Sequence, residues 1–127
     1  SSPKPIPDIS PERMKKVIDA IQSNNLQVIF DPVNLIASSE WDKQDDMVKK
    51  SFDLFGDRIV VIHVKDFVME NGKKNGRLPA GKGIFNLEHL LKICKKNKPG
   101  ISFLLENNKP DTFDDCISYV KNIYEKC

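Results

Sequence analysis

The chain has 127 residues, of which 39% are hydrophobic and 30% charged, and its formal net charge is +2. This size and composition predict one globular domain, residues 1–127, and the balanced charge excludes a strong electrostatic footprint for nucleic acid or acidic lipid. No apolar stretch approaches the roughly 20 residues of a membrane span, and the N-terminus has no signal-peptide core. We therefore expect a cytoplasmic protein without nucleic acid or membranes among its partners.

The first third of the chain predicts a helix, a short strand and a second helix. Residues 1–9 contain three prolines and are expected to form an extended lead segment. Ser10 is the predicted N-cap of a helix that Asn24 and Asn25 close, and its apolar residues have i, i+3, i+4, i+7 spacing. That stripe is Met14, Val17, Ile18 and Ile21. The run 27–31 favours a strand, and 46–56 favours a helix that ends at a glycine.

The remaining chain predicts two further strand and helix units. Residues 59–62 form a continuous apolar run, which is typical of a strand buried on both faces, and residues 68–83 are polar and predicted to be a long loop. Asn86 is the expected cap of the next helix, a strand follows at 101–105, and a last helix closes the chain. We expect that helix to bury Phe113, Ile117, Val120 and Tyr124.

The predicted order is therefore α-β-α-β-α-β-α. Strands that alternate with helices of this length indicate right-handed crossovers and a parallel sheet. Three parallel strands make an unusually small sheet, so we interpret the chain as part of a larger α/β fold. Its cysteines, Cys94, Cys116 and Cys127, are odd in number and form no CxxC pair, which favours reduced structural thiols.

Each predicted strand ends on a side chain that can bind a metal. The runs "VIFD", "VVIHVKD" and "FLLEN" carry Asp31, His63 and Glu106 at or near their carboxyl ends. Each residue alone has an ordinary structural explanation: a turn former, a core histidine or a solvated glutamate. Because parallel strands present their carboxyl ends at one edge of the sheet, the three groups should converge there. This mixed set suits a divalent ion such as Mn²⁺, Mg²⁺, Co²⁺ or Zn²⁺.

Four segments together resemble a known family. "FDPVN", "RIVVIHVKD", "LPAGKGIFNLEHLLK" and "ISFLLEN" are similar, in this order, to the last units of sugar phosphate isomerases and epimerases of the xylose-isomerase-like TIM-barrel superfamily. The resemblance implies that the fold is the C-terminal part of a (β/α)8 barrel, with three parallel strands and four helices. It implies a sugar or keto-acid substrate, and proton transfer through a cis-enediolate.

The resemblance also assigns roles to individual residues. Asp31, His63 and Glu106 match three metal ligands, and Glu106 matches one of two catalytic glutamates that act on opposite faces of the substrate. Asn34 matches a position that faces the substrate, and Lys65 and Asp66 match a His-x-Lys-Asp pattern of the family, so we expect Lys65 near the substrate as well. The glycine-rich loop matches one that lies over the site, where Lys82 or Arg77 could contact an anionic substrate group. The other glutamate has no counterpart upstream of Asp31. We therefore expect a fragment of a longer enzyme that is inactive alone, and its unpaired strand edges favour self-association.

Several alternatives stay open or are disfavoured. A small non-enzymatic α/β module for binding or oligomerisation would also explain the pattern, with incidental polar strand ends. "GRLPAGKG" resembles a phosphate-binding loop, but Gly83 stands where that motif needs a hydroxyl. Nuclease relatives use additional histidines, whereas this chain has only His63 and His89, and His89 is expected to face solvent.

Overall fold

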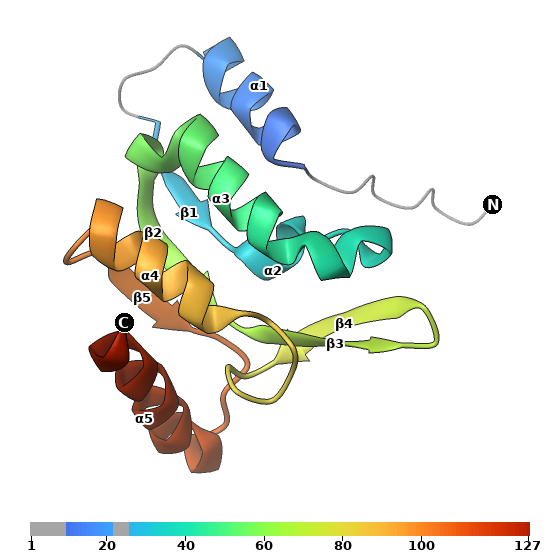
Figure 1. Cartoon of the computed structure of the whole chain (residues 1–127), viewed down its shortest axis with the longest axis vertical. Helices are drawn as coiled ribbons and strands as arrows, with labels where there is room; N and C mark the ends of the chain where they lie inside the picture. The colour runs from blue at the N-terminus through green and yellow to red at the C-terminus, as the bar shows by residue number, and fades with distance from the viewer. Residues whose placement is uncertain (1–9, 22–25) are drawn as a thin grey trace.

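A three-stranded parallel sheet forms one layer of the protein (Figure 1). The structure, a computed structural model, describes residues 10–21 and 26–127, so the predicted lead segment and the predicted end of the first helix lie outside the described residues. The strands are β1 (Val28–Phe30), β2 (Ile59–Val64) and β5 (Ser102–Leu105), in the order β1-β2-β5. The predicted parallel α/β sheet is thus confirmed.

Four long helices accompany the sheet, as the periodicity predicts. They are α1 (Pro11–Ile21), α3 (Gln44–Phe55), α4 (Leu87–Asn97) and α5 (Pro110–Lys126). The predicted caps are present: the Ser10 hydroxyl accepts the Arg13 N–H, and the Asn86 side chain accepts the His89 N–H. The structure also has short helical turns that the sequence patterns did not predict: α2 (Pro32–Leu35), η1 (Ser38–Lys43) and η2 (Gly56–Arg58). Among the described helices, none is long and apolar enough to cross a membrane.

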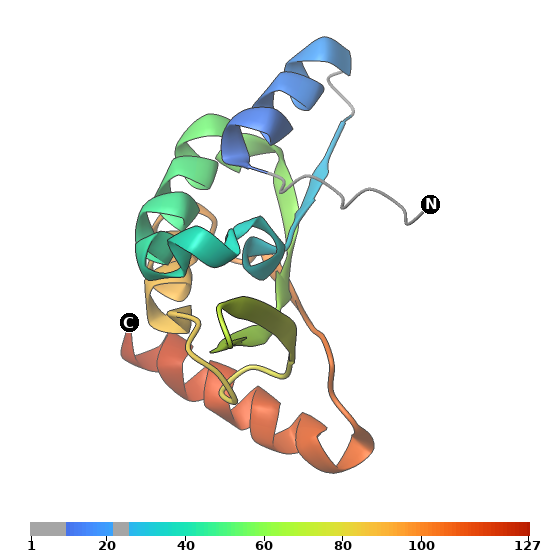
Figure 2. The same cartoon turned by 90° about the vertical axis from the view of Figure 1, so that its right-hand side faces the viewer.

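The core lies between the sheet and the helices on one of its faces. Seen edge-on in Figure 2, the helical layer lies on one side of the strands. Phe30 of β1 is fully buried, and its ring packs edge-to-face on Phe52 and Phe55 of α3, with centroid distances of 5.6 and 5.9 Å. Such aromatic pairs contribute about 0.5–1.5 kcal/mol beyond their buried area. They fix β1, and the residues that follow it, against α3.

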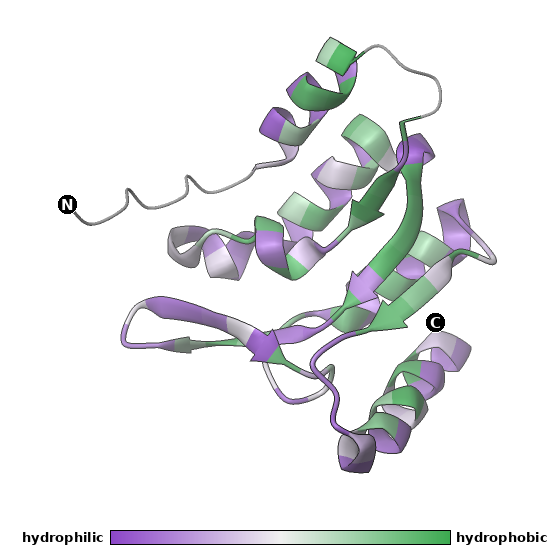
Figure 3. Ribbon diagram, turned by 180° about the vertical axis from the view of Figure 1, so that it is seen from behind, coloured by the Kyte–Doolittle hydropathy of each residue, from purple (hydrophilic) through white to green (hydrophobic). Residues whose placement is uncertain are grey.

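The opposite face of the sheet is apolar and uncovered. Ile29 is 59% exposed and Leu104 is 51% exposed, and Figure 3 shows hydrophobic strands on this side. On β2, Val61 and His63 lie on this face and are half-buried, whereas Ile62 and Val64 lie on the helical side and are fully buried. The expectation that this strand is buried on both faces is therefore wrong for the described residues, because their helices cover only one face.

The predicted loop at 68–83 is mostly an antiparallel hairpin. Strands β3 (Asp66–Glu70) and β4 (Lys73–Leu78) pair with each other and project from the body of the molecule (Figure 1). Asn71 and Gly72 form the turn with φ values of 51° and 76°. Asn-Gly is a strong signal for a two-residue hairpin turn. The signal was present in the sequence, but the charged residues around it favoured a loop assignment.

Helix α5 buries a different set of residues from the predicted stripe. Cys116 is buried, Val120 and Tyr124 are partly buried, and Phe113 and Ile117 are exposed. The helix packs mainly on α4, and it reaches the edge strand β5 through the rings of Tyr124 and Phe103, whose centroids are 6.3 Å apart. An open apolar groove of about 420 Å³ remains between α5 and β5. Periodicity identified an apolar side of the helix, but α4 and the edge strand β5 cover only part of it.

Helix α1 shows the same difference. Ile18 is buried and Met14 packs against the core, whereas Val17 and Ile21 are exposed. The helix packs on α3 at the periphery of the molecule, so only part of its apolar stripe has a partner.

The cysteines agree with a structural role. All three are free thiols, and Cys94 and Cys116 are buried. Burial raises the pKa of Cys94 to about 12, so this thiol stays protonated and unreactive at neutral pH.

The exposed apolar face leads to a prediction about association. We expect the purified chain to self-associate, because apolar patches and unpaired strand edges are rarely left open to water. Light scattering should give a mass above that of one chain, and Leu104→Ser should lower it. A strictly monomeric chain at high concentration would contradict this prediction.

Candidate metal centre

Asp31 follows β1 directly and caps the short helix α2. Its Oδ1 accepts the Asn34 N–H at 3.2 Å, and Pro32 occupies the first helical position. The second oxygen, Oδ2, accepts the Asn34 side-chain amide at 3.0 Å. Asp31 therefore has the ordinary capping role of an aspartate after a strand, yet one oxygen faces the neighbouring strand ends. The cap holds the carboxylate in a fixed orientation.

His63 and Glu106 meet across the β2–β5 pair. His63 is on β2 opposite Leu104, and the Glu106 N–H donates to the Val64 carbonyl at 3.0 Å, which continues the pairing beyond the end of β5. This register places the two side chains on the uncovered face of the sheet. His63 Nδ1 lies 2.5 Å from Glu106 Oε1, an ion pair when the imidazole is protonated.

The three predicted ligands form one cluster. Asp31, His63 and Glu106 each offer a ligand atom, and these atoms all lie within 4.8 Å of one another. The three residues are half-buried, and they form the one such group of histidine, cysteine and carboxylate side chains in residues 10–21 and 26–127. The predicted convergence of strand ends is therefore present in the structure.

Lys65 lies within the same cluster. Its ammonium group is 3.1 Å from Asp31 Oδ2, 2.8 Å from Asn34 Oδ1 and 3.9 Å from Glu106 Oε2. Its side chain is only 12% exposed. Lys65 follows the end of β2, two residues after His63, and its side chain reaches the same face of the sheet. Of the three residues expected near the substrate, Asn34 and Lys65 thus contact the cluster.

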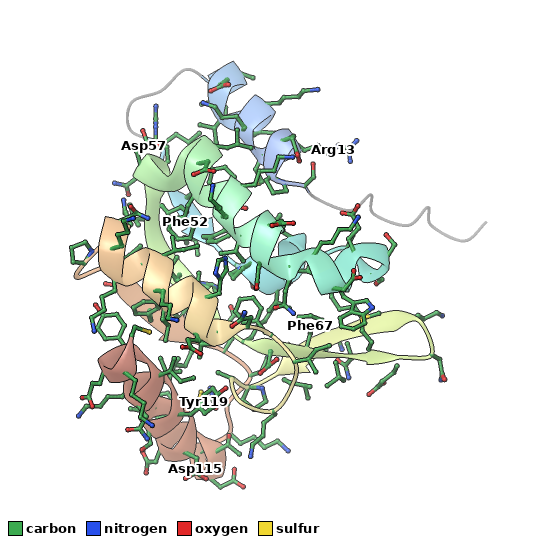
Figure 4. All side chains as sticks on the ribbon, viewed as in Figure 1. Arg13, Phe52, Asp57, Phe67, Asp115 and Tyr119 are labelled. Atoms are coloured by element: carbon green, nitrogen blue, oxygen red, sulfur yellow. The ribbon has the colours of Figure 1, made fainter. Side chains whose placement is uncertain are left out.

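Lys82 lies away from these contacts. Its side chain is exposed, and its described hydrogen bond is a backbone one, from its N–H to the Pro79 carbonyl at 3.2 Å. The structure therefore does not join Lys82 to Asp31, His63 or Glu106. The loop that carries it leaves β4 and passes close to α5, and Figure 4 shows Tyr119 on the side of α5 that faces this loop.

The buried Asp66 anchors this loop, a role that sequence reasoning missed. Its Oδ1 accepts the N–H groups of Phe67 and Phe85, both at 2.8 Å, and its Oδ2 accepts the Gly81 N–H at 3.0 Å. Asp66 is only 3% exposed. The loop is thus fixed on the residue that follows Lys65. Burial and the Asp66 charge raise the pKa of the nearby Tyr119.

Lys74 supports the site from the hairpin. Its ammonium group donates to the carbonyls of Val33 and Ile36, both at 2.6 Å, at the end of α2. These bonds connect β4 to the helical turn that presents Asn34. The lysine-rich sequence gave no indication of this contact, because lysines in a hairpin usually point to solvent.

His89 is not part of the cluster. Its Nε2 lies 3.0 Å from the Asp45 carbonyl oxygen, at the start of α3, and the residue is half-buried. His89 thus lies away from the strand ends. The prediction that His89 faces solvent was wrong, because α3 and α4 meet at this residue and half-bury it.

A family comparison agrees with this architecture. The model of the xylose isomerase-like TIM barrel family matches residues 3–123. The chain belongs to this family. Its three parallel strands with helices on one face are consistent with a part of such a barrel, as the resemblance implied. No curated protein and no solved structure gave a match.

The anchored loop gives a stability prediction. A Cβ on Gly83 would overlap the Phe67 carbonyl oxygen and Asp66 Oδ1, so Gly83→Ala must displace the loop. We expect a loss of about 2 kcal/mol or more, since overpacking costs roughly 1–3 kcal/mol and the Asp66 bonds weaken as well. Urea denaturation measures this change.

Gly56→Ala is the matched control. A Cβ added at residue 56 would have Phe52 Cδ1 as its nearest neighbour, at 3.4 Å, and the backbone of Gly56 is helical with a φ of −57°. We expect little change or a small gain in stability. Equal stability of the two variants would show that the loop is not held as described.

Proposed function

We propose that this chain carries the metal-binding edge of a divalent-metal-dependent isomerase or epimerase that acts on a sugar or sugar phosphate. The observation that carries the proposal is the convergence of Asp31, His63 and Glu106 at the carboxyl ends of three parallel strands. Membership of the xylose isomerase-like TIM barrel family supports the reaction class. In barrels of this kind, the active site lies at that edge.

The three side chains are suitable ligands for a divalent ion. One imidazole and two carboxylates suit Mn²⁺, Co²⁺ or Zn²⁺, and the carboxylates also suit Mg²⁺. The ligand atoms of the three side chains all lie within 4.8 Å of one another, so small side-chain movements would let one ion with bonds of about 2.2 Å reach all three. A divalent ion held there would supply Lewis-acid stabilisation of negative charge on the substrate oxygens.

Glu106 is the proposed acid/base residue of this chain. It is the most exposed of the three ligands, with 28% of its side chain accessible, and it lies on the uncovered face of the sheet. One oxygen faces His63, and the other lies 3.9 Å from Lys65. A carboxylate in this position can remove a proton from the carbon next to a carbonyl and return it later.

Asn34 and Lys65 are the proposed substrate-binding groups. The Asn34 amide and the Lys65 ammonium lie beside the ligands at 3.0 and 3.1 Å from Asp31 Oδ2. Amide and ammonium groups donate to hydroxyl, carbonyl or phosphate oxygens. Lys82 remains a candidate for binding an anionic group of the substrate, and only its position in the glycine-rich loop supports this role.

One observation favours a second candidate function. The Lys65 ammonium already compensates the charge on Asp31 and lies near Glu106, so the cluster is a self-sufficient ion-pair network without an ion. A small α/β module for binding or oligomerisation could keep such a network for structural reasons. Metal dependence distinguishes the two functions.

Thermal melting with Mn²⁺ tests the metal centre. We expect Mn²⁺ at about 100 times its Kd to raise the Tm by about 10 °C, because binding to the folded chain alone adds about 2.7 kcal/mol. His63→Ala should abolish the rise. His89→Ala, the matched control, should keep it, since His89 contacts the Asp45 carbonyl outside the cluster. A rise that is unchanged in His63→Ala would contradict the proposed site.

A turnover assay tests the catalytic proposal. We expect no detectable isomerase or epimerase activity from residues 1–127 alone. Within the described residues, Asp31 and Glu106 are the carboxylates of the cluster, and the sheet face that presents them is uncovered. A proton-transfer site needs a second acid/base group and exclusion of water. Turnover of a ketose that Glu106→Ala abolishes would overturn this prediction.

A further inference from the structure

The position of Lys65 suggests a role beyond substrate binding. Its ammonium group donates to Asn34 Oδ1 and forms ion pairs with Asp31 Oδ2 at 3.1 Å and, more loosely, with Glu106 Oε2 at 3.9 Å. Two of these oxygens belong to proposed metal ligands. Neighbouring residues bury most of Lys65, so that only 12% of its side chain is exposed. It is therefore an internal part of the site and not a surface lysine.

The ammonium interacts with two of the carboxylates that would bind a divalent ion. The Asp31 and Glu106 carboxylates carry two negative charges, and Lys65 is the cation that the structure places between them. Two cations that share these carboxylates at close range repel each other. Solvent screens this repulsion less at a half-buried site than at an exposed one. The ammonium and a divalent ion therefore compete.

We propose that Lys65 is a built-in competing cation that neutralises the carboxylates when no ion is bound and lowers the affinity of the site for divalent metals. This inference rests on the proposed metal centre. On metal binding, the ammonium leaves Asp31 Oδ2 and keeps its bond to Asn34 Oδ1, 2.8 Å away. It is then available for an oxygen of the substrate. Lys65 thus sets the affinity for the metal without being a ligand.

Mn²⁺ titration of the full chain tests this role. Isothermal titration calorimetry or the electron paramagnetic resonance signal of free Mn²⁺ gives the Kd for wild type and for Lys65→Met. We expect Lys65→Met to bind Mn²⁺ about tenfold more tightly or better, equivalent to about 1.4 kcal/mol. Its Tm without metal should fall, because the carboxylates lose their counter-ion, and its rise in Tm on adding Mn²⁺ should exceed that of wild type.

Two controls separate site charge from other effects. Lys92→Met removes one positive charge from an exposed pair with Glu88 on α4, so its Kd should match wild type. Lys65→Arg keeps the charge and should remain within about threefold of wild type. If Lys65→Met is too unstable to titrate, Lys65→Gln gives the same comparison with a polar side chain.

The outcomes distinguish this inference from the proposed function. Tight binding by Lys65→Met, loss of binding by His63→Ala and unchanged binding by Lys92→Met would support it. Equal or weaker binding by Lys65→Met, with wild-type binding that still depends on His63, would overturn the role of Lys65 and leave the metal centre intact. Absence of Mn²⁺ binding in both wild type and Lys65→Met would overturn both. Tightening by Lys65→Arg as well would overturn the charge argument.

Discussion

Parallel pairing of β1, β2 and β5 is the constraint on which the candidate site depends. In a parallel sheet the carboxyl ends of all strands lie at the same edge, so residues far apart in the sequence meet there. The register aligns His63 with Leu104 and carries Glu106 beside Val64. A shift by one residue would turn His63 toward the helices and break the cluster. The chemistry of the site is therefore a consequence of strand register.

Packing against the helices protects that register. Phe30 between Phe52 and Phe55 fixes β1, and the buried residues Ile62 and Val64 fix β2 on the same side. Because side chains alternate along a strand, the residues between them must point to the other face. Asp31 and His63 reach the open face for this reason. The buried core thus determines the direction of polar residues that do not belong to it.

Charge balance is the second requirement of the site. Carboxylates in a half-buried position are unfavourable without a partner, and here Lys65 and Asn34 supply one. The supporting contacts come from outside the sheet, since Lys74 of the hairpin holds the turn that carries Asn34. Asp66, one residue after Lys65, anchors the glycine-rich loop. The hairpin and this loop thus belong to the structural support of the site.

Local signals in the sequence determined the element order and the ligand set of the candidate site. Caps such as Ser10 and Asn86 depend on hydrogen bonds within one turn, and the alternation of strands with helices dictates parallel pairing. The polar strand ends Asp31, His63 and Glu106 could be predicted to converge for the same reason. The Asn-Gly turn of the hairpin was also readable, although the charges around it obscured it.

Only the tertiary structure decided which apolar residues are covered and which polar residues support the site. Periodicity tells which side chains share a face, but not how far a neighbouring element extends over it, so Phe113 and Ile117 are exposed on α5. Asp66 and Lys82 are both charged residues near or in the glycine-rich loop. Asp66 is buried and accepts hydrogen bonds from three backbone N–H groups, whereas Lys82 faces solvent. These differences arise from contacts between segments distant in sequence, which no local pattern encodes.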